Sequence, residues 1–105
     1  MKTSELTGAA LDWAVARCEG DEPCKAGGVG LRYSTDWLAG GAIIEREGMG
    51  VWMYQWNEQG EPEAGWYAED KDGDHVRTGA TPLIAAMRCY VASKLGDEVD
   101  LPPNL

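Results

Sequence analysis

The chain has 105 residues, which is enough for one domain with a modest hydrophobic core. Hydrophobic residues make up 44% of the sequence, which argues against wholesale disorder. The net charge of −9 argues against non-specific binding to nucleic acid or to an anionic membrane, because both partners require a basic patch. We therefore expect a single domain over residues 1–105, with no direct nucleic-acid binding and no membrane partner.

Cysteine usage and targeting segments indicate the compartment. The three cysteines, Cys18, Cys24 and Cys89, lack the Cys-x-x-Cys spacing of a zinc site. No N-terminal run has the apolar centre of a signal peptide, and no stretch of about 18 apolar residues occurs. These features favour a cytoplasmic protein with reduced thiols.

The first predicted helix begins at Ser4 or Glu5 and ends at Cys18, just before Gly20. Its apolar residues recur at helical spacing, with Leu11, Ala14 and Val15 on the face that we expect to be buried. Residues 19–28 are predicted to form a flexible acidic loop, because they combine glycine, proline and acidic residues.

The next segment is predicted to be short and mostly extended. Residues 29–35 are partly β-like, and Asp36 is expected to cap a single helical turn that Gly40 and Gly41 stop. Residues 42–47, Ala-Ile-Ile-Glu-Arg-Glu, are then predicted to restart as an extended segment.

A meander of three antiparallel strands is predicted to follow. The clearest strand is Gly-Val-Trp-Met-Tyr-Gln-Trp (50–56), whose alternation places Trp52, Tyr54 and Trp56 on one aromatic face. A long polar turn covers residues 57–65, the second strand residues 66–70, and the third residues 75–78 after a tight turn at Asp72-Gly73.

The last helix is expected between the cap Thr81 and the terminating Gly96, with Pro82 at its first position. Small residues line the side opposite its apolar stripe, so we expect the sheet on one side and the first helix or a second subunit on the other. Residues 99–105 are predicted to be a loose tail. The fold class is therefore α+β, with a small antiparallel sheet of three to four strands packed against two α-helices, as a homo-oligomer.

Catalytic patterns are weak in this sequence. His75, the only histidine, stands beside a hairpin turn, and no nucleophile elbow, P-loop or paired-histidine motif occurs. A metal site of Asp36, Glu45 and Glu47 is less favoured than a solvated strand edge. We expect no enzyme, no metal and no cofactor; a small hydrolase using Asp36 or Glu45 is the catalytic alternative.

Binding of an anionic ligand has more support from the residues. The aromatic rings of Tyr33, Trp37, Trp52 and Trp66 can stack on a planar ligand. Arg46 and Arg88 can clamp a carboxylate or phosphate. Thr81 heads a helix whose free N–H groups favour an anion. Arg88 lies at the edge of an apolar stripe, where a half-buried guanidinium is expected to need an anionic partner.

Three segments are specific enough to compare with a known family: LTGAALDWAVARCEG (6–20), YSTDWLAGGAIIEREG (33–48) and GATPLIAAMRCYVASKLGDEVDLP (79–102). They cover about half the chain, and in this order they resemble the NinX-like family of small phage and prophage proteins of unknown function. Ala42 stands where the family commonly has proline. The resemblance implies a phage accessory protein acting in the cytoplasm of an infected bacterium, and it implies no catalytic residues.

Two functions from different classes follow. The first is a non-catalytic counter-defence factor that binds and sequesters a small anionic ligand such as a nucleotide signal. The expected ligand-binding residues are Tyr33, Ser34, Thr35, Asp36, Trp37, Arg46, Thr81 and Arg88. The alternative is an acidic inhibitor, similar to a DNA mimic, that blocks a basic site on a host defence protein. It would use the carboxylates of residues 58–74, which otherwise serve only solubility.

Overall fold

The computed structural model describes residues 1–20 and 32–103. None of the helices in these two ranges is long and apolar enough to span a membrane. Most of the predicted acidic loop at 19–28, including Cys24, lies outside the described residues. The elements in chain order are a short 3-10 helix η1 (Thr3–Glu5), α1 (Gly8–Glu19), α2 (Trp37–Glu47), β1 (Gly50–Trp56), β2 (Pro62–Glu69), β3 (Val76–Gly79) and α3 (Pro82–Leu95).

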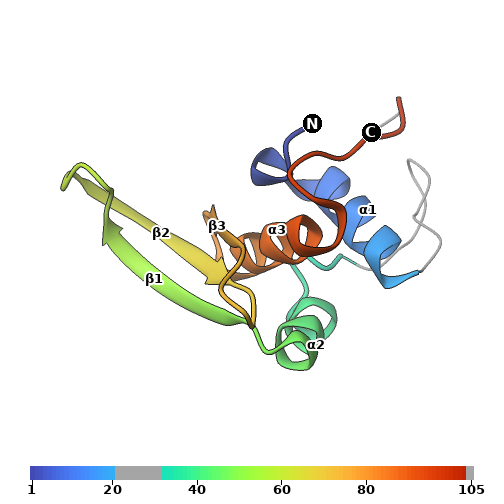
Figure 1. Cartoon of the computed structure of the whole chain (residues 1–105), viewed down its shortest axis with the longest axis horizontal. Helices are drawn as coiled ribbons and strands as arrows, with labels where there is room; N and C mark the ends of the chain where they lie inside the picture. The colour runs from blue at the N-terminus through green and yellow to red at the C-terminus, as the bar shows by residue number, and fades with distance from the viewer. Residues whose placement is uncertain (21–31, 104–105) are drawn as a thin grey trace.

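The predicted three-stranded antiparallel meander and the α+β class are confirmed. The sheet order is β1-β2-β3, and Tyr67 of β2 lies opposite Trp52 of β1 and Thr78 of β3. β2 begins at Pro62, earlier than expected, because the polar turn is compact: Asn57 Oδ1 accepts the N–H groups of Gln59 and Glu61. The β1–β2 hairpin consequently extends far beyond the helices (Figure 1).

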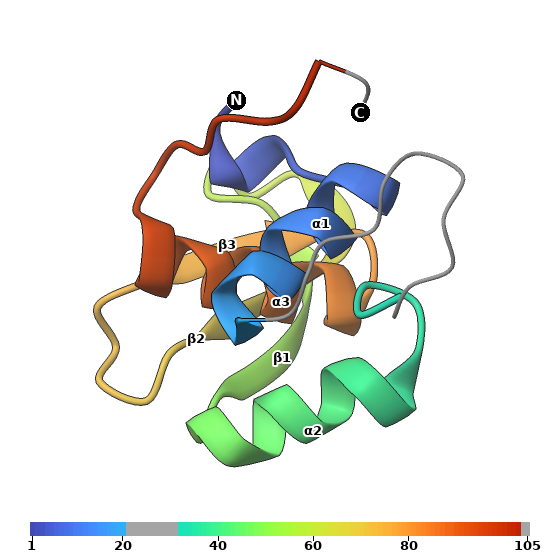
Figure 2. The same ribbon diagram turned by 90° about the vertical axis from the view of Figure 1, so that its right-hand side faces the viewer.

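Helix α3 is the centre of the domain, and it packs against every other element. The strands lie behind it and α1 in front of it in Figure 2, so α3 is covered on both sides within the chain. The side lined by small residues faces the sheet, since Cys89 Sγ donates to the His75 carbonyl and a Cβ on Gly79 would lie 2.6 Å from the Ala85 nitrogen. Thr81 Oγ1 accepts the N–H of Ile84 at 3.1 Å and Gly96 follows the last residue, which confirms both predicted ends. The homo-oligomer stays a prediction.

The central segment is a helix, so the prediction of an extended segment at 42–47 was wrong. Asp36 does cap it, since Asp36 Oδ1 accepts the N–H of Leu38, but the helix continues through Gly40 and Gly41 to Glu47. Gly40 is required for close packing. A Cβ on Gly40 would lie 2.4 Å from the Tyr33 carbonyl oxygen and 2.7 Å from Leu83 Cδ2.

The C-terminal segment is anchored at its start, in contrast to the predicted loose tail from residue 99. The N-terminal ammonium of Met1 donates to the Val99 carbonyl, and the Val99 N–H donates to the Met1 carbonyl, both at 2.9 Å. The Val99 side chain is buried with the core. These contacts hold the two ends of the described chain against each other.

Candidate functional site

Three of the expected ligand-binding residues at 33–37 are engaged in the fold. The side chains of Tyr33 and Ser34 are buried, and the Ser34 N–H donates to Asp12 Oδ1 at 2.8 Å. Asp36 is occupied as the cap of α2. These three residues therefore fix the start of α2.

Thr35 and Trp37 are the outward-facing members of this group. The Trp37 side chain is 57% exposed at the first position of α2, beside Leu38 at 86%. Trp37 and Leu38 form a small apolar surface at the start of α2, whereas Arg46 lies in the last turn of the helix.

Arg46 lies at the other end of α2 and is already paired. Its guanidinium donates to both oxygens of Glu19, at 2.8 and 2.6 Å, and to Glu47 Oε2 at 3.0 Å. It also lies over the Tyr90 ring, 5.8 Å from the centroid. The hydrogen bonds from Arg46 lower the pKa values of Glu19 and Glu47, so both remain anionic and keep the guanidinium neutralised.

Arg88 and Thr81 serve the fold in a similar way. Arg88 Nε donates to the Leu6 carbonyl at 2.7 Å and Arg88 Nη1 to the Thr78 carbonyl at 2.8 Å. The partners of this half-buried guanidinium are therefore backbone carbonyls, where the sequence had suggested an anion. The Thr81 hydroxyl is engaged as the cap of α3.

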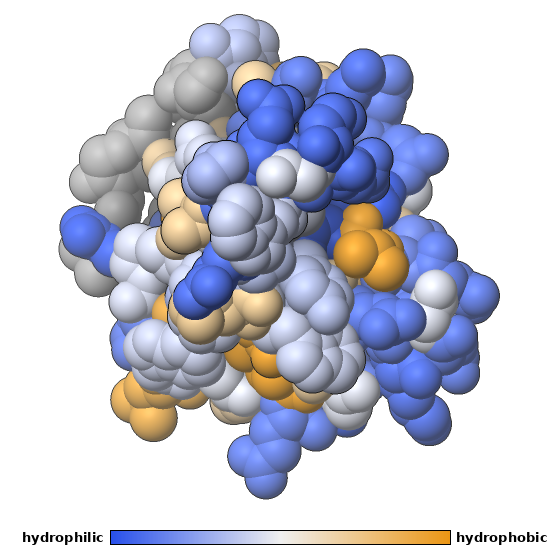
Figure 3. All heavy atoms as spheres, turned by 90° about the vertical axis from the view of Figure 1, so that its left-hand side faces the viewer, coloured by the Kyte–Doolittle hydropathy of each residue, from blue (hydrophilic) through white to orange (hydrophobic). Residues whose placement is uncertain are grey.

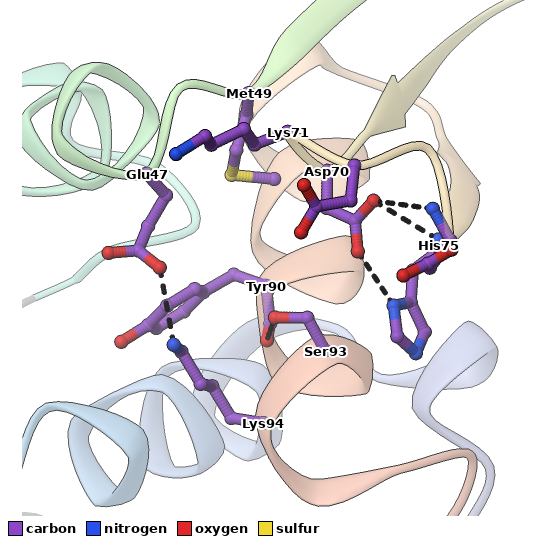
Figure 4. A pocket seen from close by; sticks show the side chains of 10 residues that line it. Glu47, Met49, Asp70, Lys71, His75, Tyr90, Ser93 and Lys94 are labelled. Carbon is purple, nitrogen blue, oxygen red and sulfur yellow. Dashed lines mark hydrogen bonds and ion pairs between the residues drawn. The ribbon is translucent and has the colours of Figure 1, made fainter.

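A cavity of about 280 Å³ lies between the end of α2, the β2–β3 turn and α3. Figure 4 shows Lys94 reaching Glu47 across the Tyr90 ring, with Nζ 3.3 Å from the carboxylate. Four carboxylates and two lysines line the cavity, so its charge does not favour an anion. The lining acidic residues are Glu47, Asp70, Asp72 and Asp74.

Asp70 and His75 form a close pair at this cavity (Figure 4). His75 Nδ1 lies 2.7 Å from Asp70 Oδ2, and Asp70 Oδ1 accepts the N–H groups of Asp74 and His75. Burial opposes ionisation of Asp70, but these hydrogen bonds prevail and lower its pKa. Ser93 Oγ donates to the Tyr90 carbonyl, so it is engaged away from the pair. The pair closes the β2–β3 turn.

No metal site is formed in the part of the chain that the structure describes. No group of three or more His, Cys, Asp or Glu residues comes together closely enough there to hold an ion. Glu45 and Glu47 were expected on an extended segment, and both lie in α2 instead, at the other end of the helix from its cap Asp36.

The most prominent surface feature is the outer face of the sheet. β-strand side chains alternate between two faces, and Ala68, Trp66 and Val51 take the inner face toward α3 and the core. Trp52, Tyr54 and Tyr67 take the outer face, where the Trp52 and Tyr67 rings stack at 5.4 Å between centroids. We call these three residues the aromatic face.

Two glycines allow the rings to lie flat on the strands. A Cβ on Gly50 would lie 2.0 Å from the Trp52 ring, and a Cβ on Gly65 would lie 2.5 Å from the Tyr54 hydroxyl. The aromatic face is nonetheless open in the described structure, since Trp52 is 46% exposed. Trp56, which follows a register shift near the hairpin tip, is a further exposed ring, at 61%. Figure 3 looks onto the hairpin end, where pale and orange residues gather beside hydrophilic ones.

Carboxylates stand at both ends of this face. Glu58, Glu61 and Glu63 are exposed around the β1–β2 turn, and Asp72 and Asp74 are exposed in the β2–β3 turn. The alternation of strand 50–56 predicted the aromatic side chains, but the sequence did not show that the hairpin extends beyond the helices. That extension depends on where α3 ends relative to the sheet, which is set by tertiary packing.

Comparison with protein families identifies the chain. No curated protein matches it. The family model described as "Bacteriophage P22, NinX" matches residues 2–94, which is most of the chain. The match includes the first two segments that carried the resemblance and the third up to residue 94. The chain therefore belongs to the bacteriophage P22 NinX family of phage proteins.

Proposed function

We propose that this phage protein is a non-catalytic accessory factor that binds a basic surface of a host protein and blocks it, in the manner of a counter-defence inhibitor. The observation that carries the proposal is the open aromatic face on a hairpin that extends beyond the helices. Host defence proteins that act on nucleic acid present basic surfaces, which makes them the class of partner that this chain fits.

The aromatic face supplies the contact energy in this proposal. Tryptophan and tyrosine are enriched among the residues that dominate protein–protein affinity, because their large rings lose little side-chain entropy on binding. Trp52 and Trp56 together give an exposed apolar surface, and the stack of Trp52 on Tyr67 holds that surface in one geometry.

The carboxylates supply selectivity and speed. With a net charge of −9 and acidic turns at both ends of the face, the protein attracts basic surfaces and repels acidic ones. Solvent-exposed charges of this kind are screened at high salt, so the association is expected to weaken steeply as salt rises.

The test is capture of host proteins from bacterial lysate by the immobilised phage protein, at about 0.05 M and about 0.5 M salt. One variant combines W52A and W56A, and its control is W37A, an equally exposed tryptophan on α2. A second variant combines E58Q, E61Q and E63Q. Its charge-matched control combines E5Q, E45Q and D100N, which are exposed positions away from the hairpin.

The proposal expects basic host proteins that the wild type and both controls retain at low salt and release at high salt. The two hairpin variants should lose them. Retention by the hairpin variants equal to that of the controls, or binding that salt does not weaken, contradicts the proposal.

The sequestering of a small anionic ligand, such as a nucleotide signal, is a second proposal. The four carboxylates of the cavity oppose an anion, and one observation favours it: Lys71 lines the cavity and has no carboxylate partner among the described residues. Its test is a thermal shift with a nucleotide panel. A nucleotide that raises the melting temperature of the wild type and not of K71M supports it, and the absence of any shift contradicts it.

A further inference from the structure

The two edges of the sheet are treated differently. At the β3 edge, two carbonyls that face away from β2 are occupied by guanidinium groups: Val76 O accepts from Arg77 Nη1 and Thr78 O accepts from Arg88 Nη1, both at 2.8 Å. β3 is also only four residues long. Short length and capped carbonyls are how natural proteins prevent an edge strand from pairing with another chain.

The β1 edge is longer and has no such protection. In the described structure no strand pairs with its outer side, and its seven residues include no charge and no proline. Natural edge strands commonly carry lysine, proline or inward-pointing charges, because an unprotected row of N–H and C=O groups is a template for pairing.

Hydrogen-bond alternation identifies the free groups on β1. The Asp70 N–H donates to the His75 carbonyl, so Asp70 and every second residue before it direct their backbone groups toward β3. The residues between them, including Tyr67, direct theirs toward β1. Trp52, opposite Tyr67, therefore directs its backbone groups inward. Val51 and Met53 direct theirs outward, and no hydrogen bond from another described residue reaches them.

We propose that the β1 edge accepts an extended, basic segment of a protein partner, which pairs with the outward backbone groups of Val51 and Met53 and so adds a fourth strand to the sheet. This inference rests on the proposed function, since it names how the basic partner is held. Strand addition of this kind obtains affinity from backbone hydrogen bonds and selectivity from alternate side chains.

Charge determines the occupant. Two copies paired through β1 would each bring a net charge of −9 and an acidic β1–β2 turn, so like charges would meet. Every second side chain of an added strand would lie beside Trp52 on the outer face, where a lysine or arginine gains a cation–π contact with the ring. A basic extended segment satisfies both conditions.

The probe is a synthetic seven-residue peptide of alternating lysine and threonine, as long as β1. Two further versions carry N-methyl groups on alternate backbone amides, one on the odd and one on the even positions. An added strand directs only alternate amides toward β1, so one methylated version should bind at least about tenfold more weakly than the other. Calorimetry or fluorescence of the tryptophans gives the affinities.

A matched pair of variants tests the protein side. M53P removes an outward N–H without touching the β1–β2 ladder, whereas M53A keeps that N–H and shortens the side chain. We expect M53P to bind the peptide at least about tenfold more weakly than M53A does. If M53P does not fold, as judged by circular dichroism, the two methylated peptides still test strand addition on the wild-type protein.

The outcomes separate this inference from the proposed function. Equal binding of the two methylated peptides, no peptide binding at all, or a β1-paired dimer in light scattering that M53P dissociates, contradicts strand addition. The proposed function depends instead on salt-sensitive capture of host proteins by Trp52, Trp56 and the acidic turn. It can stand when strand addition fails, and it fails if that capture is absent.

Discussion

At the scale of single residues, the polar residues of the sequence motifs bind other residues of the same chain and so stabilise the fold. Glu19 accepts two hydrogen bonds from Arg46 and one from the Tyr90 hydroxyl, which ties α1, α2 and α3 together at one point. Burial and the hydrogen bond to Glu19 raise the pKa of Tyr90, so its hydroxyl remains a donor. Residues of these types could bind a ligand, but in this cluster they form hydrogen bonds with one another.

Replacing Glu19 tests this assignment. E19Q removes the charge from a carboxylate that is only 15% exposed and leaves Arg46 with a weaker acceptor. We expect a loss of about 1–2 kcal/mol in the free energy of unfolding, measured by urea denaturation. The control E45Q, on the exposed side of α2, should stay within about 0.5 kcal/mol of the wild type. Equal stability of the two variants would show that the cluster is unimportant for the fold.

The same cluster predicts a pH dependence. Folding lowers the pKa of Glu19 below its ordinary value of 4.5, chiefly through the hydrogen bond from Arg46. The stabilisation is therefore complete above pH 4.5 and is lost as the pH falls through the lowered pKa. The stability difference between the wild type and E19Q should shrink on acidification below pH 4.5, because contributions from Glu47 and Asp70 are common to both proteins. A difference that is constant down to pH 3 contradicts this assignment of Glu19.

At the scale of elements, α2 is where sequence-based prediction failed. Gly-Gly within a helix costs about 1 kcal/mol per glycine relative to alanine, so the local sequence predicts that the helix stops at Gly40 and Gly41. The helix forms because Ile43 is buried in the core and because a glycine at position 40 lets α2 approach Tyr33 and Leu83 closely. A tertiary contact, invisible in the local sequence, outweighed a local propensity.

The glycine pair provides a matched experiment on α2. G40A places a methyl group 2.4 Å from the Tyr33 carbonyl oxygen, so we expect a loss of about 1–3 kcal/mol in the free energy of unfolding. In G41A the nearest atom is Trp37 Cε3 at 3.4 Å, and the alanine should stabilise the helix by up to about 1 kcal/mol. Urea denaturation of both variants gives the comparison. Destabilisation of G41A by as much as G40A would contradict the packing of α2.

Other elements were predictable because their determinants are local. Thr81, Pro82 and Gly96 define α3 by capping chemistry alone, and the alternation of 50–56 defines β1. The site was less predictable. Arg46 and Arg88 have the chemistry of anion-binding residues, but their partners come from segments 27 and 82 positions away in the sequence. Residue type indicates what a side chain can bind, and only the fold shows whether another residue of the chain already occupies it.

At the scale of the whole molecule, the helices and the hairpin have different roles. The other helices pack around α3, and most of the charged residues of the sequence motifs bind other residues of the helical part. The hairpin lengthens the molecule to 41 Å, compared with 27 and 23 Å in the other two directions. Two of the three exposed tryptophans of the described residues, Trp52 and Trp56, and the acidic β1–β2 turn lie on that hairpin. The central claim of this account is that the hairpin is the partner-binding part of the protein.

Hydrogen exchange of the phage protein, alone and with a host protein that it captures, tests this claim most directly. The account predicts slower exchange in β1 and β2, including the outward amides of Val51 and Met53, with little change in residues 33–37 or in α2. The same host protein should give no protection in the W52A/W56A variant. Protection centred on residues 33–37, or on the cavity lined by Lys94 and Tyr90, with the hairpin unchanged, would contradict it.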